Sequence, residues 1–334
     1  MADTVNNAFN EFMKETINLD PDDTLTAKKS RQYLVDQILT FPETDKEFPK
    51  IYIEHYNFFG SFSRSTKKRP LDDIDILICL NASGCTYRET NNHIEIETIN
   101  AVEYFTKLTH EQSTLLNSKK VINKFLTKLK DVPKYQAAII QRDMEAATLN
   151  LTSYDWKFDI VPCFMTTPNE FNKTYYIIPD GNGHWQKTDP RLDKKRIKYI
   201  NSLHNGYLLK TIRLAKYWNK RPTMPSIPSY LFENMILDYY ASRILNKAGI
   251  HVDVELTNVF YDIQTRIYNI VNDPKEIQGD INTVPAEERK KIAARAKLDY
   301  DRAVEARKFE DSGNHESAIK KWIEILGDKF PKFD

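Results

Sequence analysis

The stretch "FFGSFSRSTKKRPLDDIDILICL", residues 58–80, places a Gly-Ser pair ahead of an apolar run that two aspartates interrupt. Alternate residues of a strand point to the same face, so Asp73 and Asp75 are expected side by side while Ile74 faces the core. Two carboxylates that close repel each other unless a cation neutralises them. The chain holds only nine glycines. A glycine ahead of this strand therefore asks for an explanation.

A third carboxylate interrupts a second apolar strand, "KFDIVPCFM", at Asp159. If the two strands are neighbours, Asp73, Asp75 and Asp159 form one acidic cluster. Mg²⁺ prefers oxygen ligands and is usually bound by a few carboxylates together with substrate phosphates. Such a cluster can hold two metal ions, one activating a hydroxyl and one stabilising a leaving pyrophosphate.

Gly60 and Ser61 have the chemistry of a phosphate-binding turn. A glycine lets the backbone approach a ligand closely, and the N–H groups and the serine hydroxyl that follow can cradle a phosphate. The cations that come next, Arg64, Lys67 and Lys68, are expected in a solvated loop. A D-x-D pair or a G-S pair alone is a weak signal, but the ordered combination with a third strand aspartate is specific.

Composition indicates a globular protein of 334 residues, with 41% hydrophobic and 28% charged residues. Lys+Arg number 48 and Asp+Glu 47, so no overall field draws the chain to nucleic acid or to an anionic membrane. The first residues lack the pattern of a signal peptide, and no apolar run reaches about 18 residues. Cys79, Cys85 and Cys163 have no metal-ligand spacing. We expect reduced thiols in a cytoplasmic protein.

Apolar periodicity predicts an α/β first part followed by a helical second part. The predicted strands are 74–80, 135–141, 147–152, 156–165 and a strand running into the turn at 174–185. The predicted helices are 5–17, 25–41, 121–129, 206–220, 229–249, 254–272, 285–313 and 315–327. We expect two domains, residues 1–202 with the sheet and residues 203–334 with helices.

The quoted motif closely resembles the G-S…D-x-D signature of the polymerase-β-like nucleotidyltransferases. It is most similar to the branch of oligoadenylate synthases, cyclic GMP–AMP synthase and the bacterial CD-NTases. "FDIVPCF" resembles the third-carboxylate strand of that family, and "YYIIPDGNGHWQKTDP" resembles the segment after it in bacterial members. "NDPKEIQGDIN" and "ESAIKKWIEILGDKFP" resemble the C-terminal half of CD-NTases. The resemblance covers most of the chain from Asn57 onward.

The resemblance implies a mixed-sheet nucleotidyltransferase lobe packed on a helical lobe, with the active site in the cleft. It implies that Asp73, Asp75 and Asp159 are catalytic and bind two Mg²⁺, for which Mn²⁺ can substitute. Gly60 and Ser61 would hold the donor triphosphate.

Four further residues are assigned to the nucleotide by the same resemblance. "RLAKYWNK" and "PSYLFENMIL" match the helices whose Lys and Ser grip the triphosphate, which points to Lys216 and Ser229, with Lys210 as a competing lysine. Tyr230 matches an aromatic residue that stacks on a base. The alternatives are a solvated helix charge for Lys216 and a core ring for Tyr230.

The implied activity is synthesis of a cyclic di- or trinucleotide from nucleoside triphosphates, ATP among them, in bacterial anti-phage (CBASS) signalling. A downstream effector would bind the product, and the enzyme would act as a monomer. No histidine-cysteine zinc insertion for DNA is present, and the near-neutral charge indicates no surface for double-stranded RNA or a membrane. We therefore expect no DNA or long double-stranded RNA activator, and no membrane partner. The runner-up is a template-independent RNA- or tRNA-tailing enzyme. A third possibility is a nucleotide-binding or protein-modifying relative.

Overall fold

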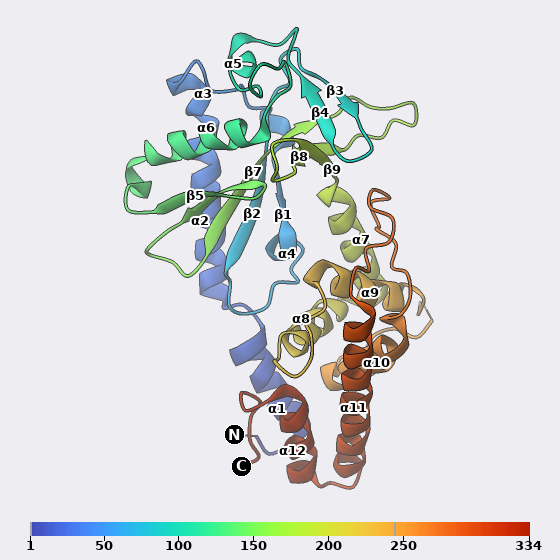
Figure 1. Ribbon diagram of the computed structural model, residues 1–334. Coiled ribbons are helices and arrows are strands. Elements are labelled where there is room, and N and C mark those ends of the chain that lie inside the picture. The colour runs from blue at the N-terminus through green and yellow to red at the C-terminus, as the bar shows by residue number, and fades with distance from the viewer. Residues whose placement is uncertain (1, 244) are drawn as a thin grey trace. The chain divides into compact units, whose positions relative to one another are not determined.

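The computed structural model describes residues 2–243 and 245–334, and it divides into two compact units (Figure 1). The sheet unit comprises Pro21–Ser63 and Leu71–Arg191. The helical unit comprises the chain up to Asp20, Arg64–Pro70 and Leu192–Asp334. These borders differ from the expected domains 1–202 and 203–334, which stay a prediction about the functional lobes.

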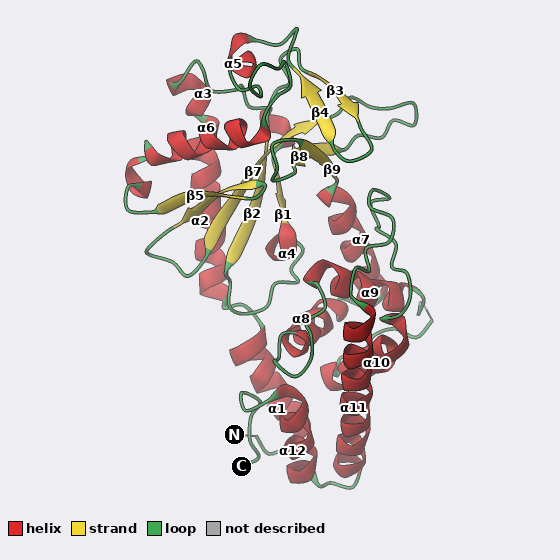
Figure 2. Ribbon diagram, in the orientation of Figure 1, coloured by secondary structure: helices red, strands yellow, loops and turns green. Residues whose placement is uncertain are grey.

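The sheet unit is built on nine strands in one mixed sheet (Figure 2). The main path runs β1 (Asn57–Phe59), β2 (Asp73–Cys79), β7 (Lys157–Met165), β8 (Tyr176–Pro179), β9 (Trp185–Thr188), β4 (Ile94–Glu97) and β3 (Thr86–Glu89). β5 (Ile139–Asp143) pairs with β6 (Ala146–Asn150), which pairs with β7. β2 and β7 are parallel to each other. The predicted α/β class is confirmed.

The two central strands are apolar beyond their aspartates because both faces are covered there. Residues Ile76 to Cys79 of β2 are all buried, as are residues Ile160 to Phe164 of β7. Strands buried on both faces read as continuous apolar runs. The helices of this unit are α2 (Pro21–Leu39), α3 (Phe41–Thr44), α4 (Gly60–Ser63), α5 (Glu103–Thr106) and α6 (Ser118–Lys130).

Two features of the sheet unit differ from the sequence prediction. The β3–β4 hairpin was not expected, because its strands are short and β3 is exposed throughout. The expected strand 135–141 begins only at Ile139, since Pro133–Tyr135 forms a 3₁₀ turn before it.

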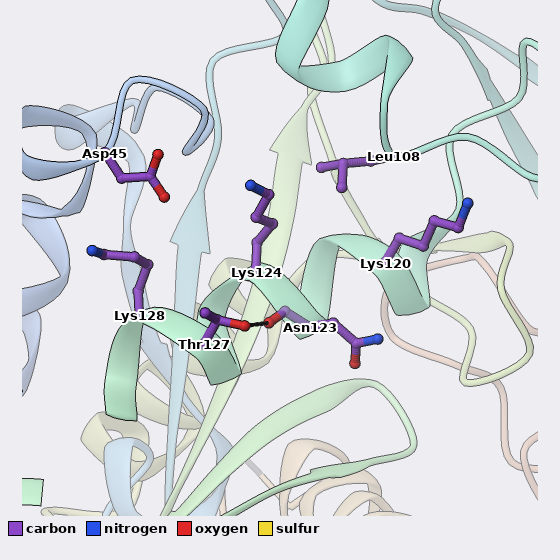
Figure 3. A pocket seen from close by; sticks show the side chains of 7 residues that line it. All are labelled: Asp45, Leu108, Lys120, Asn123, Lys124, Thr127 and Lys128. Atoms are coloured by element: carbon purple, nitrogen blue, oxygen red, sulfur yellow. Dashed lines mark hydrogen bonds between the residues drawn. The ribbon is translucent and has the colours of Figure 1, made fainter. Parts of the chain in front are cut away.

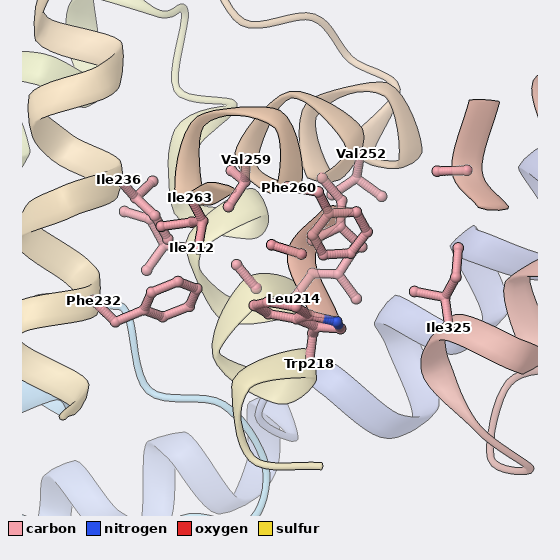
Figure 4. Close-up of a cluster of buried hydrophobic side chains, with 14 of the residues drawn as sticks. Ile212, Leu214, Trp218, Phe232, Ile236, Val252, Val259, Phe260, Ile263 and Ile325 are labelled. Carbon is pink, nitrogen blue, oxygen red and sulfur yellow. The ribbon is translucent and has the colours of Figure 1, made fainter. Parts of the chain in front are cut away.

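The helical unit contains α1 (Val5–Phe12) with a π-helical turn (Met13–Ile17), α7 (Pro190–Leu203), α8 (Leu208–Asn219), α9 (Ser229–Ala241), α10 (Val252–Arg266), α11 (Ala286–Asp311) and α12 (His315–Leu326). Its core collects large apolar side chains from α8, α9 and α10, including Trp218, Phe232 and Phe260 (Figure 4). The Trp218 indole donates to Asp299 Oδ2 of α11 at 2.7 Å. The predicted helices 229–249 and 254–272 end earlier, at Ala241 and Arg266. No helix among the described residues is long and apolar enough to cross a membrane.

A buried ion-pair cluster explains why the segment Arg64–Pro70 belongs to the helical unit. The Glu233 carboxylate of α9 accepts hydrogen bonds from Arg64 Nε at 2.6 Å, from Thr66 Oγ1 at 2.8 Å and from Lys216 Nζ at 2.9 Å. Burial alone would raise the pKa of Glu233, but the charges of Arg64 and Lys216 lower this pKa to about 2. Two cations therefore depend on one carboxylate.

Replacing that carboxylate is expected to destabilise the fold strongly. Glu233→Gln leaves Arg64 and Lys216 buried without their counter-charge, which typically costs about 3–5 kcal/mol of unfolding free energy. Because the folded pKa lies below the ordinary value of 4.5, the contribution of Glu233 is complete above about pH 4.5 and is lost as the pH falls towards about 2. Urea unfolding at several pH values measures both effects. The gap between wild type and variant should therefore narrow in acid.

The control is Glu316→Gln, which removes an exposed partner of Lys320. It should leave the unfolding curve nearly unchanged. Equal losses of unfolding free energy in the two variants would contradict the proposed contribution of the buried cluster to stability.

Candidate functional site

Three aspartates share one face of two adjacent strands. β2 and β7 run parallel, with Asp75 in register with Asp159 and Asp73 in register with Lys157. Paired residues of neighbouring strands lie on the same face, and so do residues two apart on one strand. The expectation that the two aspartate-bearing strands are neighbours is confirmed.

The third aspartate is held by two neighbours on this face. Thr148 of β6 donates its hydroxyl to Asp159 Oδ1 at 3.0 Å. Lys157 Nζ lies 3.2 Å from Asp159 Oδ2. Burial works against the charge of Lys157, but Asp159, Asp143 and Asp73 together raise the pKa of that lysine. The face thus carries a negative potential strong enough to stabilise a nearby cation.

The donor chemistry of this face fits a hard divalent cation. The three side chains offer only carboxylate oxygens, which Mg²⁺ and Mn²⁺ prefer over sulfur or imidazole. Among the described residues, no three His, Cys, Asp or Glu side chains converge closely enough to hold a metal ion. Metal binding by Asp73, Asp75 and Asp159 therefore stays a prediction. Bringing the three carboxylates onto one ion would require side-chain movement, because they do not converge in this structure.

The glycine of the opening motif is explained by the aspartate of β2. β1 pairs antiparallel with β2 so that Phe59 lies opposite Asp75, and the chain turns into α4 at Gly60. Gly60 has a φ of +67°, and a Cβ there would lie 1.7 Å from Asp75 Oδ2. A side chain at residue 60 fits only if the Asp75 side chain moves, because real Cβ contacts are essentially never so short. The structure thus brings the Gly60–Ser61 turn directly against Asp75.

The two candidate lysines differ in their surroundings. Lys216 is 8% exposed and is paired with Glu233, and burial lowers its pKa against the opposing effect of that carboxylate. The alternative expectation of a solvated helix charge is therefore wrong. Lys210 donates to the Ile250 carbonyl and lies 4.9 Å from the centroid of the Tyr207 ring. Binding of a triphosphate by either lysine stays a prediction.

Tyr230 is anchored by its hydroxyl group. The hydroxyl donates to Asp193 Oδ1 at 2.7 Å, and Lys275 Nζ lies 2.5 Å from the hydroxyl and 4.1 Å from the ring centroid. Burial and Asp193 raise the pKa of Tyr230, so the phenol stays neutral. The ring packs at the edge of the helical core, as the alternative expectation of a core ring has it. Ser229, the exposed first residue of α9, precedes it. Stacking and phosphate binding by this pair stay predictions.

Sequence inspection missed a histidine stack in the sheet unit. The ring of His184 stacks on His93 with centroids 4.0 Å apart and on His110 with centroids 4.9 Å apart. Burial and the two neighbouring rings lower the pKa of His184. These residues are far apart in the sequence, so no local pattern could have revealed the stack.

A lysine-lined depression of about 310 Å³ lies beside α6 (Figure 3). Lys120, Lys124 and Lys128 follow one another at helical spacing along it, with Asp45 opposite. Lys124 Nζ lies 3.8 Å from Glu47 Oε2, and Lys128 Nζ lies 3.0 Å from Asp131 Oδ2. This partly compensated surface offers no group for phosphoryl transfer, and we assign it no role in the site.

Gly60→Ala is expected to disrupt the site far more than an alanine at an open position. Alanine at a positive φ costs about 1–2 kcal/mol wherever it stands, and at residue 60 the Asp75 carboxylate must move as well. The matched control is Gly206→Ala, because Gly206 has a φ of +81° and nothing within 4 Å of its Cβ position. Urea unfolding and nucleotide turnover measure the two effects. Equal losses in both variants would contradict a specific role for the Gly60–Asp75 contact.

Comparisons with known proteins agree with this geometry. A curated protein of Bacillus cereus (strain VD146), named probable cyclic nucleotide synthase, is 40% identical over 335 aligned positions. The match covers 100% of this chain and 100% of that protein. No protein-family model matches the chain.

Solved structures share the fold at low sequence identity. CdnC of E. coli MS115-1 with ATP has a TM-score of 0.68 at 14% identity, covering 98% of both chains. CdnC in a complex with HORMA-deltaN has a TM-score of 0.70 at 13% identity, again covering 98% of both. The cyclic AMP-GMP synthase DncV of Vibrio cholerae has a TM-score of 0.59 at 12% identity, over 83% of this chain and 70% of that chain. With a full-length relative at 40% identity, the chain belongs to the CD-NTase family of the polymerase-β-like nucleotidyltransferase superfamily.

Proposed function

We propose that this protein makes a cyclic di- or trinucleotide from nucleoside triphosphates, ATP among them, and releases pyrophosphate. The observation that carries the proposal is the register of Asp75 with Asp159, together with the close approach of Gly60 to Asp75. A carboxylate-bearing face next to a phosphate-binding turn is what transfer of a nucleotidyl group requires. The name of the Bacillus cereus relative supports the same reaction class.

Each residue has a distinct part in this proposal. Gly60 and Ser61 bind the donor triphosphate, and Asp73, Asp75 and Asp159 hold two Mg²⁺ ions, which Mn²⁺ can replace. The ions would polarise the phosphates and offset the charge of the leaving pyrophosphate. A ribose hydroxyl oxygen forms a bond to the α-phosphorus while the bond from that phosphorus to the pyrophosphate oxygen breaks. A carboxylate on the aspartate face accepts the hydroxyl proton.

The partners follow from the family and are part of the proposal. CdnC has been solved with ATP and in a complex with HORMA-deltaN. For this chain we propose a cytoplasmic monomer whose product binds a downstream effector in anti-phage (CBASS) signalling. Neither DNA nor long double-stranded RNA is needed as an activator, because the net charge of +1 supplies no general attraction for a polyanion.

A product assay tests the reaction class. The wild-type protein is incubated with single and mixed nucleoside triphosphates and Mg²⁺, without RNA, and products are identified by mass spectrometry before and after phosphatase treatment. We expect a phosphatase-resistant product, because a closed ring has no terminal phosphate. Asp75→Asn should abolish it by removing one carboxylate charge. Asp155→Asn, which changes an exposed aspartate in the segment before β7, should leave product formation unchanged.

The runner-up predicts a different outcome of the same experiment. If a labelled tRNA or poly(A) primer lengthens and no resistant small product forms, the chain is an RNA-tailing enzyme. Undiminished product formation by Asp75→Asn would contradict the role proposed for the aspartate face. If the wild-type protein forms neither a resistant small product nor a lengthened RNA, the nucleotide-binding or protein-modifying relative is favoured.

A further inference from the structure

An arginine of α2 contacts both aromatic residues that flank the Gly60–Ser61 turn. The Arg31 guanidinium carbon lies 3.5 Å from the centroid of the Phe58 ring and 5.8 Å from the centroid of the Phe62 ring. Phe58 precedes the Gly-Ser pair within β1, and Phe62 follows it within α4. One planar cation thus spans the two ends of the turn.

The position of this arginine is fixed on the helix side. α2 is 19 residues long and buries Ala27, Leu34, Val35 and Ile38 around Arg31. On the turn side, the Ser63 hydroxyl donates to the Phe58 carbonyl at 2.8 Å and closes the same loop. Phe62 is only 8% exposed. Arg31 therefore packs against a short loop that is also closed by its own Ser63–Phe58 hydrogen bond.

The charge of Arg31 has a cost that packing alone does not explain. Its Nε atom is buried and, within the described part of the chain, has no hydrogen-bond partner. Burial lowers the pKa of Arg31, and Tyr56 opposes this shift. An arginine remains charged at neutral pH even so. A methionine or leucine would fill the space without desolvating a cation. Packing alone therefore does not account for a charged residue at this position.

We infer that Arg31 is a positioning residue of the nucleotide site, which fixes the Gly60–Ser61 turn through Phe58 and Phe62 and favours a polyanion there by its charge. The inference rests on the proposed function, because it takes the phosphates of a nucleoside triphosphate as the ligand of the turn. Stacking of a guanidinium on an aromatic face is geometrically specific and contributes modestly when exposed and more when desolvated. A cation beside the turn also offsets the charge of bound phosphate, with an effect that salt weakens only partly in a half-buried position.

The test measures binding rather than turnover. Isothermal titration gives the affinity of wild type and variants for an α,β-methylene ATP analogue and for adenosine, each in Mg²⁺, and thermal melting reports the fold. Arg31→Met keeps an unbranched side chain but loses the charge and the planar stack. We expect about tenfold weaker binding of the ATP analogue, adenosine binding within twofold of wild type, and a melting temperature close to that of wild type.

Two further variants separate the contribution of the positive charge from that of guanidinium stacking on the Phe58 ring. Arg31→Lys keeps the charge but not the planar stack and should fall between wild type and Arg31→Met. Phe58→Leu keeps apolar volume but removes the ring face, and should reproduce the loss seen in Arg31→Lys. Lys28→Met is the matched control, because Lys28 is an exposed cation on the same helix. It should bind both ligands like wild type.

The inference is overturned if Arg31→Met binds the ATP analogue as tightly as wild type. It is also overturned if the Arg31 variants lose the analogue and adenosine equally while their melting temperatures fall, since that pattern marks a purely structural residue. Should Arg31→Met fail to fold, the milder Arg31→Lys decides by the same two ligands. Failure of the proposed function is distinguishable, because wild type would then form no cyclic product yet could still bind the analogue in an Arg31-dependent manner.

Discussion

The contact between the Gly60 backbone and the Asp75 carboxylate is the constraint on which the candidate site depends. A Cβ at residue 60 would lie 1.7 Å from Asp75 Oδ2, and Gly60 itself has a φ of +67°. β1 ends at Phe59, opposite Asp75 of β2, and the turn that follows begins at Gly60. The parallel pairing of β2 with β7 then sets Asp159 level with Asp75. The Gly-Ser…D-x-D motif and the register of β2 with β7 thus place Gly60, Asp75 and Asp159 at one site.

The Asp159 carboxylate of the aspartate face is neutralised by a partly exposed cation, whereas the carboxylate of Glu233 in the helical unit is neutralised by buried ones. Lys157 lies beside Asp159 at 35% side-chain exposure, where its ammonium can give way to another cation at little cost. Arg64 and Lys216 share the Glu233 carboxylate in a buried cluster, where removal of one partner leaves a charge without compensation. In the partly exposed Lys157–Asp159 pair the ammonium can be replaced by a metal ion, whereas the buried Glu233 cluster stabilises the fold. This contrast makes Lys216 a structural residue whatever else it does.

Much of the sheet and the aspartate face could be predicted because the signals are local. An aspartate inside an apolar strand is conspicuous, and strand periodicity assigns Asp73 and Asp75 to one face. The β3–β4 hairpin escaped prediction because its exposed strand lacks alternation. The histidine stack, the pairing of Lys216 with Glu233 and the stacking of Arg31 on Phe58 are contacts between residues far apart in the sequence. A single sequence carries no signal for such contacts, since each residue is unremarkable in its own segment.

We propose that Asp73, Asp75 and Asp159 jointly hold divalent metal next to a nucleotide on the Gly60–Ser61 turn. Anomalous diffraction at the manganese edge, from crystals grown with Mn²⁺ and an α,β-methylene ATP analogue, tests it most directly. We expect manganese peaks at about 2.1 Å from oxygens of the three carboxylates, with the triphosphate against Gly60 and Ser61. Clear density for the nucleotide without manganese at these aspartates, or manganese bound elsewhere in the chain, would contradict it.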